Sequence, residues 1–438
     1  MDINSQYIHK EMGAALPVTE HVLIIDPTSR STAIKGGEQT TFDIPTASGA
    51  NGSFIDMNSS YISFKLSAEG TTGAVVTAKK ARLSKAGIHG LFGTIDVESS
   101  GYTVEHTTDY AQLHSVLSDI SGVTEDRSGY TALAEGLAVA AYTTPAALNQ
   151  GCDLPITVVN PPDKSGDLRF TCPIPSQCLN SGSHLPVHAI SQLRYRITWA
   201  KAAEGVVSGV ADADCVNFRI EEPKLHLCYL EMSSASRSVI TQKSKGLSWS
   251  LPMWETHRAN LSDGLGSTTF RIPSHKSSIK TLLTTFQDST GATSGANSTK
   301  LNADCLSRDF PNVENFQYRL NGQFYPQQEV ECTGGATTAA IELMRAFHKT
   351  KAQSGMITRD NFTKKANLAA GGKFAIATNV ESNQGRSNSS FAGVSTLQEA
   401  PLLTLKFDVN KSNPQTVFNY VQYDTNHSIV NGIWKVDM

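Results

Sequence analysis

Apolar and polar residues alternate along one stretch of the chain, and the period then changes. Residues 91–98 place Leu91, Gly93, Ile95 and Val97 on one side and Thr94, Asp96 and Glu98 on the other, which predicts a half-buried strand. Ser99, Ser100 and Gly101 predict a turn into a second strand. From Asp109 the apolar positions recur at steps of three and four, at Tyr110, Leu113, Val116, Leu117 and Ile120. This spacing predicts an amphipathic helix, N-capped by Thr107 or Thr108, with Gln112, Ser115 and Asp119 facing away from the core.

The second half of the chain repeats this order of elements. Residues 316–326, FQYRLNGQFYP, alternate across Asn321-Gly322, and a helical pattern follows in ATTAAIELMRAFHK. Its predicted apolar stripe consists of Ile341, Leu343, Met344 and Phe347. The turn glycines Gly101 and Gly322 are 221 positions apart, close to half the chain length. This spacing indicates an internal duplication.

Other segments repeat at similar spacings. TTFDIP from Thr40 returns as TTFRIP from Thr268, and SYISFKLSAE from Ser60 aligns with SIKTLLTTFQD from Ser278. QLRYRITW from residue 192 aligns with LLTLKFDV from residue 402. The three spacings, 228, 218 and 210 positions, drift as expected when loops vary in length and strands do not.

Eight or so strands and one helix in each half predict an all-β chain of two tandem eight-stranded jelly-roll β-sandwiches, each with a short helix. We place an N-terminal arm at residues 1–35, the first jelly roll at 36–235 and the second at 236–438, with a polar linker, SSASRSVITQKSKG, at the boundary. The arm contains an extended HVLIIDP, and a short helix at residues 7–12 is an option. Residues 122–162 carry little period and predict a long loop with one helical piece.

Composition and charge exclude several functions. The net charge is −3 with both signs scattered, so the chain has no basic face for phosphates, and we expect no direct nucleic-acid binding. The seven cysteines are irregularly spaced and no apolar signal region begins the chain, which predicts free thiols in a reducing compartment. The weakly polar run 132–148 is broken by Glu135, Gly136 and Pro145 and is too short to span a bilayer.

The sequence offers no catalytic, cofactor-binding or metal-binding residues. A Gly-rich phosphate loop, a GxSxG elbow and an HExxH helix are all missing. Pro186 breaks any helix that would aim His184 and His188 at one metal ion, and Glu221 and Glu222 are adjacent, so a strand points them to opposite faces. Cys172 and Cys178 are too far apart for a zinc knuckle and are better explained as buried strand thiols. Asp212 and Asp214 could bind calcium, but a solvated acidic loop is the preferred interpretation. For Trp199, Trp249, Trp254 and Trp434, packing between sheets is preferred over a sugar site.

Several phrases resemble a known family. YISFKLSA, GIHGLFGTIDVESSGYTVE and DYAQLHSVLSDIS resemble the first barrel of the double jelly-roll major capsid proteins of icosahedral DNA viruses. HLPVHAISQLRYRITWA and FRIEEPKLHLCYLEM resemble the closing strands of that barrel, and HKSSIKTLLTTF with FQYRLNGQFYP the opening of the second. The resemblance covers most of the chain from Thr40 onward and is nearest to the polinton-like virus, adintovirus and virophage group.

This resemblance implies a structural protein of the virion, assembled inside the host cell and without enzymatic activity. It implies a homotrimer whose six barrels form a pseudo-hexagonal capsomer, which contacts neighbouring capsomers, penton proteins and minor or cement proteins; an internal membrane beneath the shell is an option. Three segments are candidates for contacts between subunits: the N-terminal arm, residues 122–162 and the tail 422–438. The alternative is that they cover their own barrel.

Two other classes of function remain open from the sequence. One is a two-jelly-roll enzyme acting on glycans or glycopeptides, which needs paired carboxylates at the junction between the barrels. The other is a carbohydrate-binding adhesin, for which the tryptophans are the natural contacts.

Overall fold

The computed structural model describes the strand framework of the chain. The described residues are 18–29, 33–46, 53–69, 81–84, 86–121, 134–136, 153–154, 156–157, 168–180, 184–201, 206–208, 217–233, 247–262, 264–288, 308, 310–332, 337–347, 374–381, 392–407 and 414–437. The helix at residues 7–12, most of the loop 122–162 and of the linker, and Asp212 and Asp214 lie outside them.

The first barrel consists of two antiparallel sheets. Sheet 1A has the order β1 (Val18–Ile25), β14 (Asn217–Met232), β4 (Ser53–Glu69), β10 (Leu168–Pro173). Sheet 1B has the order β3 (Gln39–Ile44), β12 (Leu193–Trp199), β6 (Phe92–Ser99), β7 (Tyr102–Thr107). Alternate residues of both sheets point inward, and Phe64 of β4 contacts Trp199 of β12 with ring centroids 5.5 Å apart.

The second barrel repeats this arrangement strand for strand. Sheet 2A has the order β15 (Leu247–Leu261), β22 (Gln415–Val430), β17 (Ile279–Asp288), β20 (Ile376–Asn379), and β23 (Ile433–Asp437) pairs with β22. Sheet 2B has the order β16 (Ser267–Arg271), β21 (Leu402–Phe407), β18 (Val313–Leu320), β19 (Gln323–Glu331). Each repeated phrase of the sequence occupies the same place in its barrel, so the predicted duplication of two eight-stranded jelly rolls is confirmed.

Shorter elements fill the edges of the first barrel. Three short strands pair with strands of sheet 1A: β2 (Ile34–Lys35), β9 (Ile156–Thr157) and β11 (His184–Leu185). Three more form a separate small sheet: β5 (Ala81–Leu83), β8 (Asp153–Leu154) and β13 (Val206–Ser208). Two further elements are 3₁₀ helices, η1 (Gly87–Leu91) and η5 (Val187–Ala189). Leu91 therefore ends η1, and the predicted strand begins one residue later, at Phe92.

Tight hairpins join the paired strands β6–β7, β18–β19 and β22–β23. Their central residues, Ser100-Gly101, Asn321-Gly322 and Asn431-Gly432, all have positive φ angles. Turns of this hand match the right-handed twist of the flanking strands, and glycine adopts the second position without steric cost. The two hairpins predicted from the sequence, at Gly101 and Gly322, are confirmed.

In the described part of each barrel, a helix follows the hairpin: α2 (Tyr110–Ser121) in the first and α8 (Thr337–Ala346) in the second. The predicted caps Thr107 and Thr108 are wrong, because the carbonyl of Asp109 accepts the first helical bond, from the amide of Leu113. In α8 the predicted stripe is partly wrong: Leu343 is buried, but Ile341 is 47% exposed. No described helix is long and apolar enough to cross a membrane.

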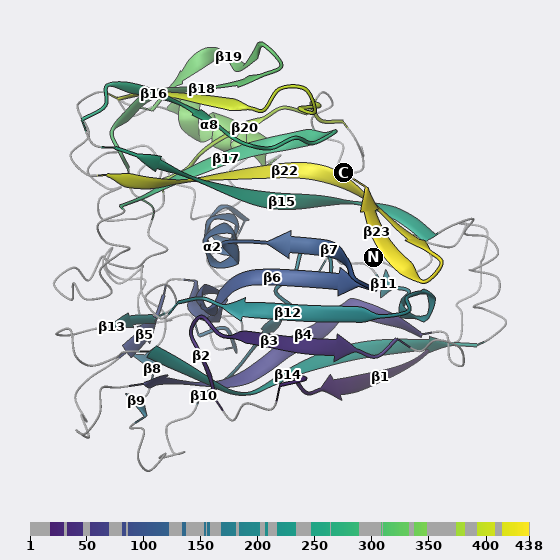
Figure 1. Cartoon of the computed structure of the whole chain (residues 1–438). Coiled ribbons are helices and arrows are strands. Elements are labelled where there is room, and N and C mark those ends of the chain that lie inside the picture. The colour runs from purple at the N-terminus through teal and green to yellow at the C-terminus, as the bar shows by residue number, and fades with distance from the viewer. Residues whose placement is uncertain are drawn as a thin grey trace.

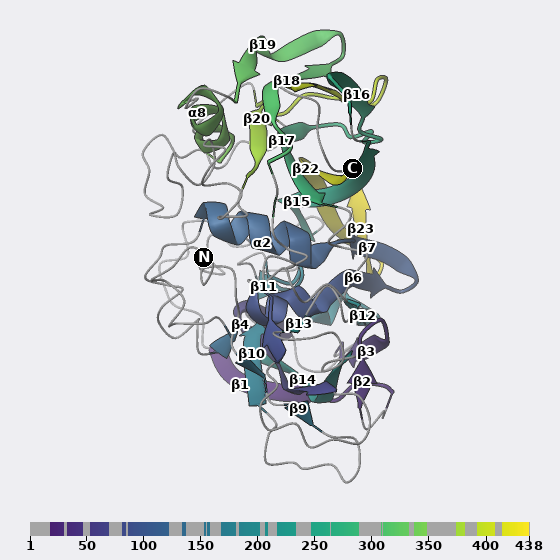
Figure 2. The same ribbon diagram turned by 90° about the vertical axis from the view of Figure 1, so that its left-hand side faces the viewer.

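The four sheets stack in the order 1A, 1B, 2A, 2B, with α2 between the two barrels (Figure 1). Seen from the side, α2 crosses the junction between the first barrel and sheet 2A, below α8 (Figure 2). The core of the first barrel also takes up side chains from the second half of the chain, namely Met253, Tyr423, Ile429 and Trp434. Apolar side chains of both barrels therefore pack in one continuous buried cluster.

Candidate functional site: the junction between the barrels

Helix α2 is packed against both barrels. Its apolar side chains Leu113, Val116 and Ile120 are buried in one cluster with residues of sheet 2A and α8, among them Trp254, Leu283, Leu343, Phe418 and Tyr420. Tyr110, at the start of the helix, belongs to the core of the first barrel. A helix wedged in this way resists changes in the angle between the barrels, because rotation would open cavities on one side of it.

The polar side of α2 is also covered, which corrects the sequence-based prediction. Ser115 and Asp119, expected to face away from the core, are 3% and 1% exposed. The carboxylate of Asp119 accepts a hydrogen bond from the guanidinium of Arg308, itself 4% exposed, in the second half of the chain. At the other end of α2, Asp109 pairs with Arg258 of β15. Two ion pairs thus link one helix to the second barrel.

Glu105 of β7 organises the loop that follows β10. This carboxylate, 1% exposed, accepts hydrogen bonds from Ser176 Oγ at 2.5 Å, the Gln177 amide at 2.9 Å and the Cys178 amide at 3.0 Å. Thr107 Oγ1 donates a fourth, at 2.8 Å. Burial and the neighbouring Glu105 raise the pKa of the Cys178 thiol well above its ordinary value, so it stays protonated. A buried carboxylate with four donors holds this loop in one conformation.

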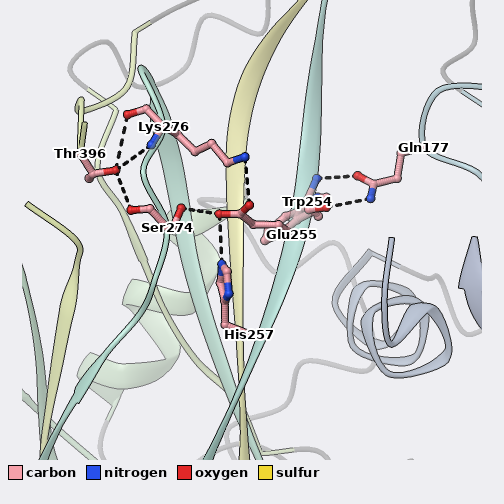
Figure 3. Close-up of polar contacts among 7 residues, drawn as sticks. All are labelled: Gln177, Trp254, Glu255, His257, Ser274, Lys276 and Thr396. Atoms are coloured by element: carbon pink, nitrogen blue, oxygen red, sulfur yellow. Dashed lines mark hydrogen bonds and ion pairs between the residues drawn. The ribbon is translucent and has the colours of Figure 1, made fainter. Parts of the chain in front are cut away.

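Gln177, held in place by that loop, connects the first barrel to the edge strand of sheet 2A (Figure 3). Its side-chain carbonyl accepts the backbone N–H of Trp254 at 2.5 Å, and its Nε2 donates to the Trp254 carbonyl at 2.9 Å. The amide side chain therefore makes the pair of bonds that a neighbouring strand would make to β15. An edge strand buried in a junction needs such partners, because unpaired backbone groups are costly away from water.

A second carboxylate, Glu255, lies one residue further along β15 (Figure 3). Ser274 Oγ donates to it, Lys276 Nζ lies 3.1 Å from its Oε2, and His257 Nε2 lies 3.2 Å from its Oε1. Burial raises the pKa of Glu255, but the contacts with His257, Ser274 and Lys276 outweigh that effect, so its pKa lies below the ordinary value. Thr396 fixes the same segment by accepting the Lys276 amide and donating to the Ser274 carbonyl.

The C-terminal hairpin of β22 and β23 closes the junction at its other end. Trp434, fully buried, donates its backbone N–H to Ser99 Oγ of β6 at 3.1 Å, and the Gly432 carbonyl accepts the amide of Ser191 at 2.7 Å. The sequence predicts that the tail 422–438 contacts other subunits or covers its own barrel. Through Asp437, the tail belongs to β22 and β23 of the second barrel and packs against the first barrel of the same chain, and the contact between subunits stays a prediction.

His427 lies within this hairpin and forms a cluster with the rings of Trp249 and Trp434, in which all three centroid distances are 5.7 Å. Trp434 Nε1 donates to His427 Nδ1 at 3.1 Å, and Thr425 Oγ1, which donates to the Leu251 carbonyl, lies 2.8 Å from His427 Nε2. This pattern fits the neutral ring with its proton on Nε2. Burial lowers the pKa of His427 to about 4.

Acid should therefore destabilise the fold through His427. The unfolded chain binds this proton with the ordinary pKa of 6.5, so the stabilisation is complete above that pH and is lost as the pH falls toward about 4. We expect a loss of about 1.4 kcal/mol per pH unit, about 3 kcal/mol in all. Denaturant unfolding at pH 7 and pH 4.5 measures this loss. His427→Gln should flatten the dependence, whereas the exposed His21→Gln should not; equal pH dependence in both variants would refute the prediction.

Glu105→Gln should lower the free energy of unfolding by about 1.5–3 kcal/mol, because a neutral amide accepts the three loop donors less strongly and adds a donor of its own. Glu98→Gln on the adjacent strand is the matched control. Glu98 pairs with Arg196 at 3.0 Å with both side chains about a quarter exposed, so it should lose about 1 kcal/mol or less. Urea unfolding compares the two, and equal losses would mean that Glu105 does not organise the loop.

Other residues weighed from the sequence are dispersed. His184 lies 4.0 Å from Asp56, whereas His188 packs edge-on against Phe54. Glu221 pairs with Arg219, and Glu222 with Lys65 and Arg169. Cys172 and Cys178 are buried free thiols, although Cys178 lies in the loop after β10 and not in a strand. Among the described residues, no group of three or more His, Cys, Asp or Glu side chains is arranged as a metal site.

Trp199, Trp254 and Trp434 are buried, and Trp249 stacks on His427 with centroids 5.7 Å apart. Packing between sheets, the preferred interpretation of the tryptophans, is confirmed for Trp199 and Trp434, whereas Trp254 packs against the helices α2 and α8. The sequence missed Glu105, which is buried, and Glu255, which is 19% exposed, because single acidic residues in strands carry no pattern. Both are held by donors from several segments, as expected for structural carboxylates.

Comparisons with known proteins rest on structure. No protein-family model and no curated protein matches the sequence. The PBCV-1 VP54 crystal structure fitted into a cryo-EM reconstruction of the virophage Sputnik matches with a TM-score of 0.59 and 11% identity, over 99% of both chains. The Faustovirus major capsid protein matches with a TM-score of 0.61 and 7% identity, over 97% of this chain and 92% of that one. The mavirus major capsid protein matches with a TM-score of 0.53 and 11% identity, over 95% and 90%.

The chain has the double jelly-roll fold. The likeness extends over nearly the whole chain, so it includes both barrels and the junction that joins them. At such low identity it is a likeness of fold, and the predicted double jelly roll is confirmed. Placement near the polinton-like virus, adintovirus and virophage group stays a prediction.

Proposed function

We propose that this double jelly-roll chain is the major capsid protein of an icosahedral virion. The observation that carries the proposal is the repetition of one strand order in two fused barrels, in a fold shared with capsid proteins over nearly its full length. Three copies of such a chain place six similar barrels in a ring. A trimer can then fill a lattice of hexagonal tiles, since each side of the ring presents a similar barrel.

The junction suits this role because a tile needs a fixed angle between its barrels. Helix α2, the buried Asp119–Arg308 pair and the C-terminal hairpin hold that angle from within one chain. The outer faces of the barrels are then left for contacts between copies, between neighbouring capsomers and with penton and minor or cement proteins. We propose no catalytic activity and no direct contact with the genome.

Strand β1 is our candidate for a contact between copies. It lies at the end of sheet 1A, and its side chains Val22 and Ile24 are 55% and 53% exposed. An edge strand with exposed apolar side chains is a natural interaction surface, because a partner covers both the side chains and the backbone edge.

The mass of the purified protein in native mass spectrometry tests the capsid proposal. A trimer is expected, with hexagonal outlines in electron micrographs. A monomer that binds or cleaves glycans would instead support the enzyme or adhesin alternatives and would reject the shell.

A paired variant locates the contact. Val22→Thr with Ile24→Thr retains strand propensity but removes apolar area, so it should lower the fraction of trimer. Leu397→Thr, at a residue 59% exposed in the segment before β21, is the matched control and should not. Equal trimer fractions in both variants would exclude β1 as the contact.

We also propose the division of the chain into a first jelly roll at 36–235 and a second at 236–438. Within the proposed arm 1–35, Val18–Ile25 forms β1 and pairs with β14 along its whole length. The proposed arm therefore contributes a strand to the first barrel, and the exposed side chains of β1 stay available for contacts between copies.

A further inference from the structure

Sheet 2A holds a lysine between two carboxylates. Lys280 Nζ lies 2.9 Å from Asp424 Oδ1 and 3.3 Å from Glu381 Oε1. The three side chains are 14%, 1% and 5% exposed, so water has little access to the group. They come from three neighbouring strands of the sheet: Lys280 lies on the middle strand β17, Asp424 on β22, and Glu381 just after β20.

A β-bulge in β17 directs the side chain of Lys280 toward the two carboxylates. Ile279 opposes Tyr423 and Thr281 opposes Gln422, so Lys280 is the extra residue of a β-bulge. Bulges turn a side chain away from the regular alternation of a strand. The carbonyl of Lys280 accepts the amide of Val380 at 2.9 Å, which ties the bulge to the segment that carries Glu381.

Hydrogen bonds also orient the carboxylate of Asp424 and fix the backbone of Glu381. Ser278 Oγ donates to Asp424 Oδ2 at 2.9 Å, which leaves Oδ1 toward the lysine, and the Asp424 amide donates to the Ser278 carbonyl at 3.0 Å. The Glu381 amide donates to Asn379 Oδ1 at 2.7 Å. The nucleophile, the acceptor carboxyl and a second acid are thus placed by the fold.

We propose that Lys280 and Asp424 become joined by an intramolecular amide bond, with Glu381 as the proton carrier. In the first step, the Lys280 ammonium transfers a proton to the Asp424 carboxylate, which gives an amine and a carboxylic acid in contact. The amine nitrogen attacks Cγ of Asp424, and the new C–N bond replaces a C–O bond. Glu381 takes a proton from the nitrogen and delivers it to the departing hydroxyl, which leaves as one water molecule.

The reaction needs no oxidant, reductant or added reagent. Ammonium and carboxylate become amide and water, and Glu381 ends in the protonation state in which it began. Holding the two groups in contact replaces an encounter in solution, and well-oriented pairs reach effective concentrations of about 10⁵–10⁸ M.

Two other lysine–carboxylate pairs differ from Lys280–Asp424, and we expect neither of them to form an amide bond. Lys65 and Glu222 are 2.6 Å apart, but their side chains are 30% and 49% exposed, so water stabilises the charged forms. Lys276 and Glu255 are more buried, but His257 and Ser274 contact Glu255 and hold its pKa below the ordinary value, which keeps it ionised. These pairs are internal controls.

The bond would fasten β17 to β22 next to Tyr423, whose side chain belongs to the core of the first barrel. It would reinforce the second barrel close to the junction. This inference rests on the geometry of sheet 2A and does not depend on the capsid proposal.

Mass spectrometry of the full-length purified protein tests the bond. We expect an intact mass lower than that of the sequence by one water molecule, and a proteolytic fragment in which the peptides containing Lys280 and Asp424 are linked. Recovery of both peptides unlinked would overturn the proposal, and this result requires no variant to fold.

Variants separate the roles of the three residues. Lys280→Arg and Glu381→Gln should retain the full mass of their sequences, whereas the control Lys276→Arg should still lose one water molecule. Asp424→Asn should release ammonia and give a product identical in mass to the linked wild-type chain. A water loss that persists in Lys280→Arg would assign the bond to another lysine and overturn the proposal.

Discussion

Replacing Arg308 with leucine is expected to lower the free energy of unfolding by about 3–5 kcal/mol, because it leaves the carboxylate of Asp119 buried without its cationic partner. Asp119 is 1% exposed on α2, and Arg308 is 4% exposed in the second half of the chain. Calorimetry and urea unfolding both measure the loss. The angle between the barrels should also become less well defined, since the pair crosses the junction.

Two variants test whether burial is the cause. Arg258→Leu removes the partner of Asp109 at the other end of α2, but the Arg258 side chain is 54% exposed, so the expected loss is about 1 kcal/mol or less. Arg308→Leu combined with Asp119→Leu removes both buried charges and should recover most of the stability. If Arg308→Leu costs no more than Arg258→Leu, the buried pair does not stabilise the junction.

Trp434→Ala should also cost about 3–5 kcal/mol, the range for removing a large aromatic side chain from a core. The indole is fully buried, and its N–H donates to His427, so truncation leaves both a cavity and a histidine nitrogen without its donor. Because β23 contacts the first barrel, the variant is expected to unfold in two transitions, one for each barrel, in differential scanning calorimetry.

Trp434→Phe is the matched control, since it retains an aromatic ring and removes the N–H group and part of the indole volume. Its expected cost is about 1–3 kcal/mol, and its unfolding should stay a single transition. A single transition in Trp434→Ala, with a loss of less than about 1 kcal/mol, would show that the hairpin does not couple the barrels.

The sequence was most informative where one face of an element meets a core and the other meets solvent. Alternation in residues 316–326 located β18, β19 and their turn, because a strand with one buried face has a period of two. It was least informative for α2. Polar Ser115 and Asp119 suggested a solvent face, yet both are buried, and Asp119 pairs with Arg308 in the second half of the chain. Ile341 of α8 shows the reverse, an apolar side chain that the tertiary structure leaves 47% exposed.

By itself, the sequence determined that this chain consists of two jelly rolls with the same order of strands. That information is local, since the periodic patterns of strands and turns depend on neighbouring residues. After an internal duplication, the same patterns occur in both halves of the chain. Only the tertiary structure decided how the barrels are joined: that Gln177 pairs with β15, that Asp119 meets Arg308, and that Lys280 lies between Asp424 and Glu381. These contacts join residues up to 189 positions apart, and the polarity of a residue does not specify which distant partner it meets.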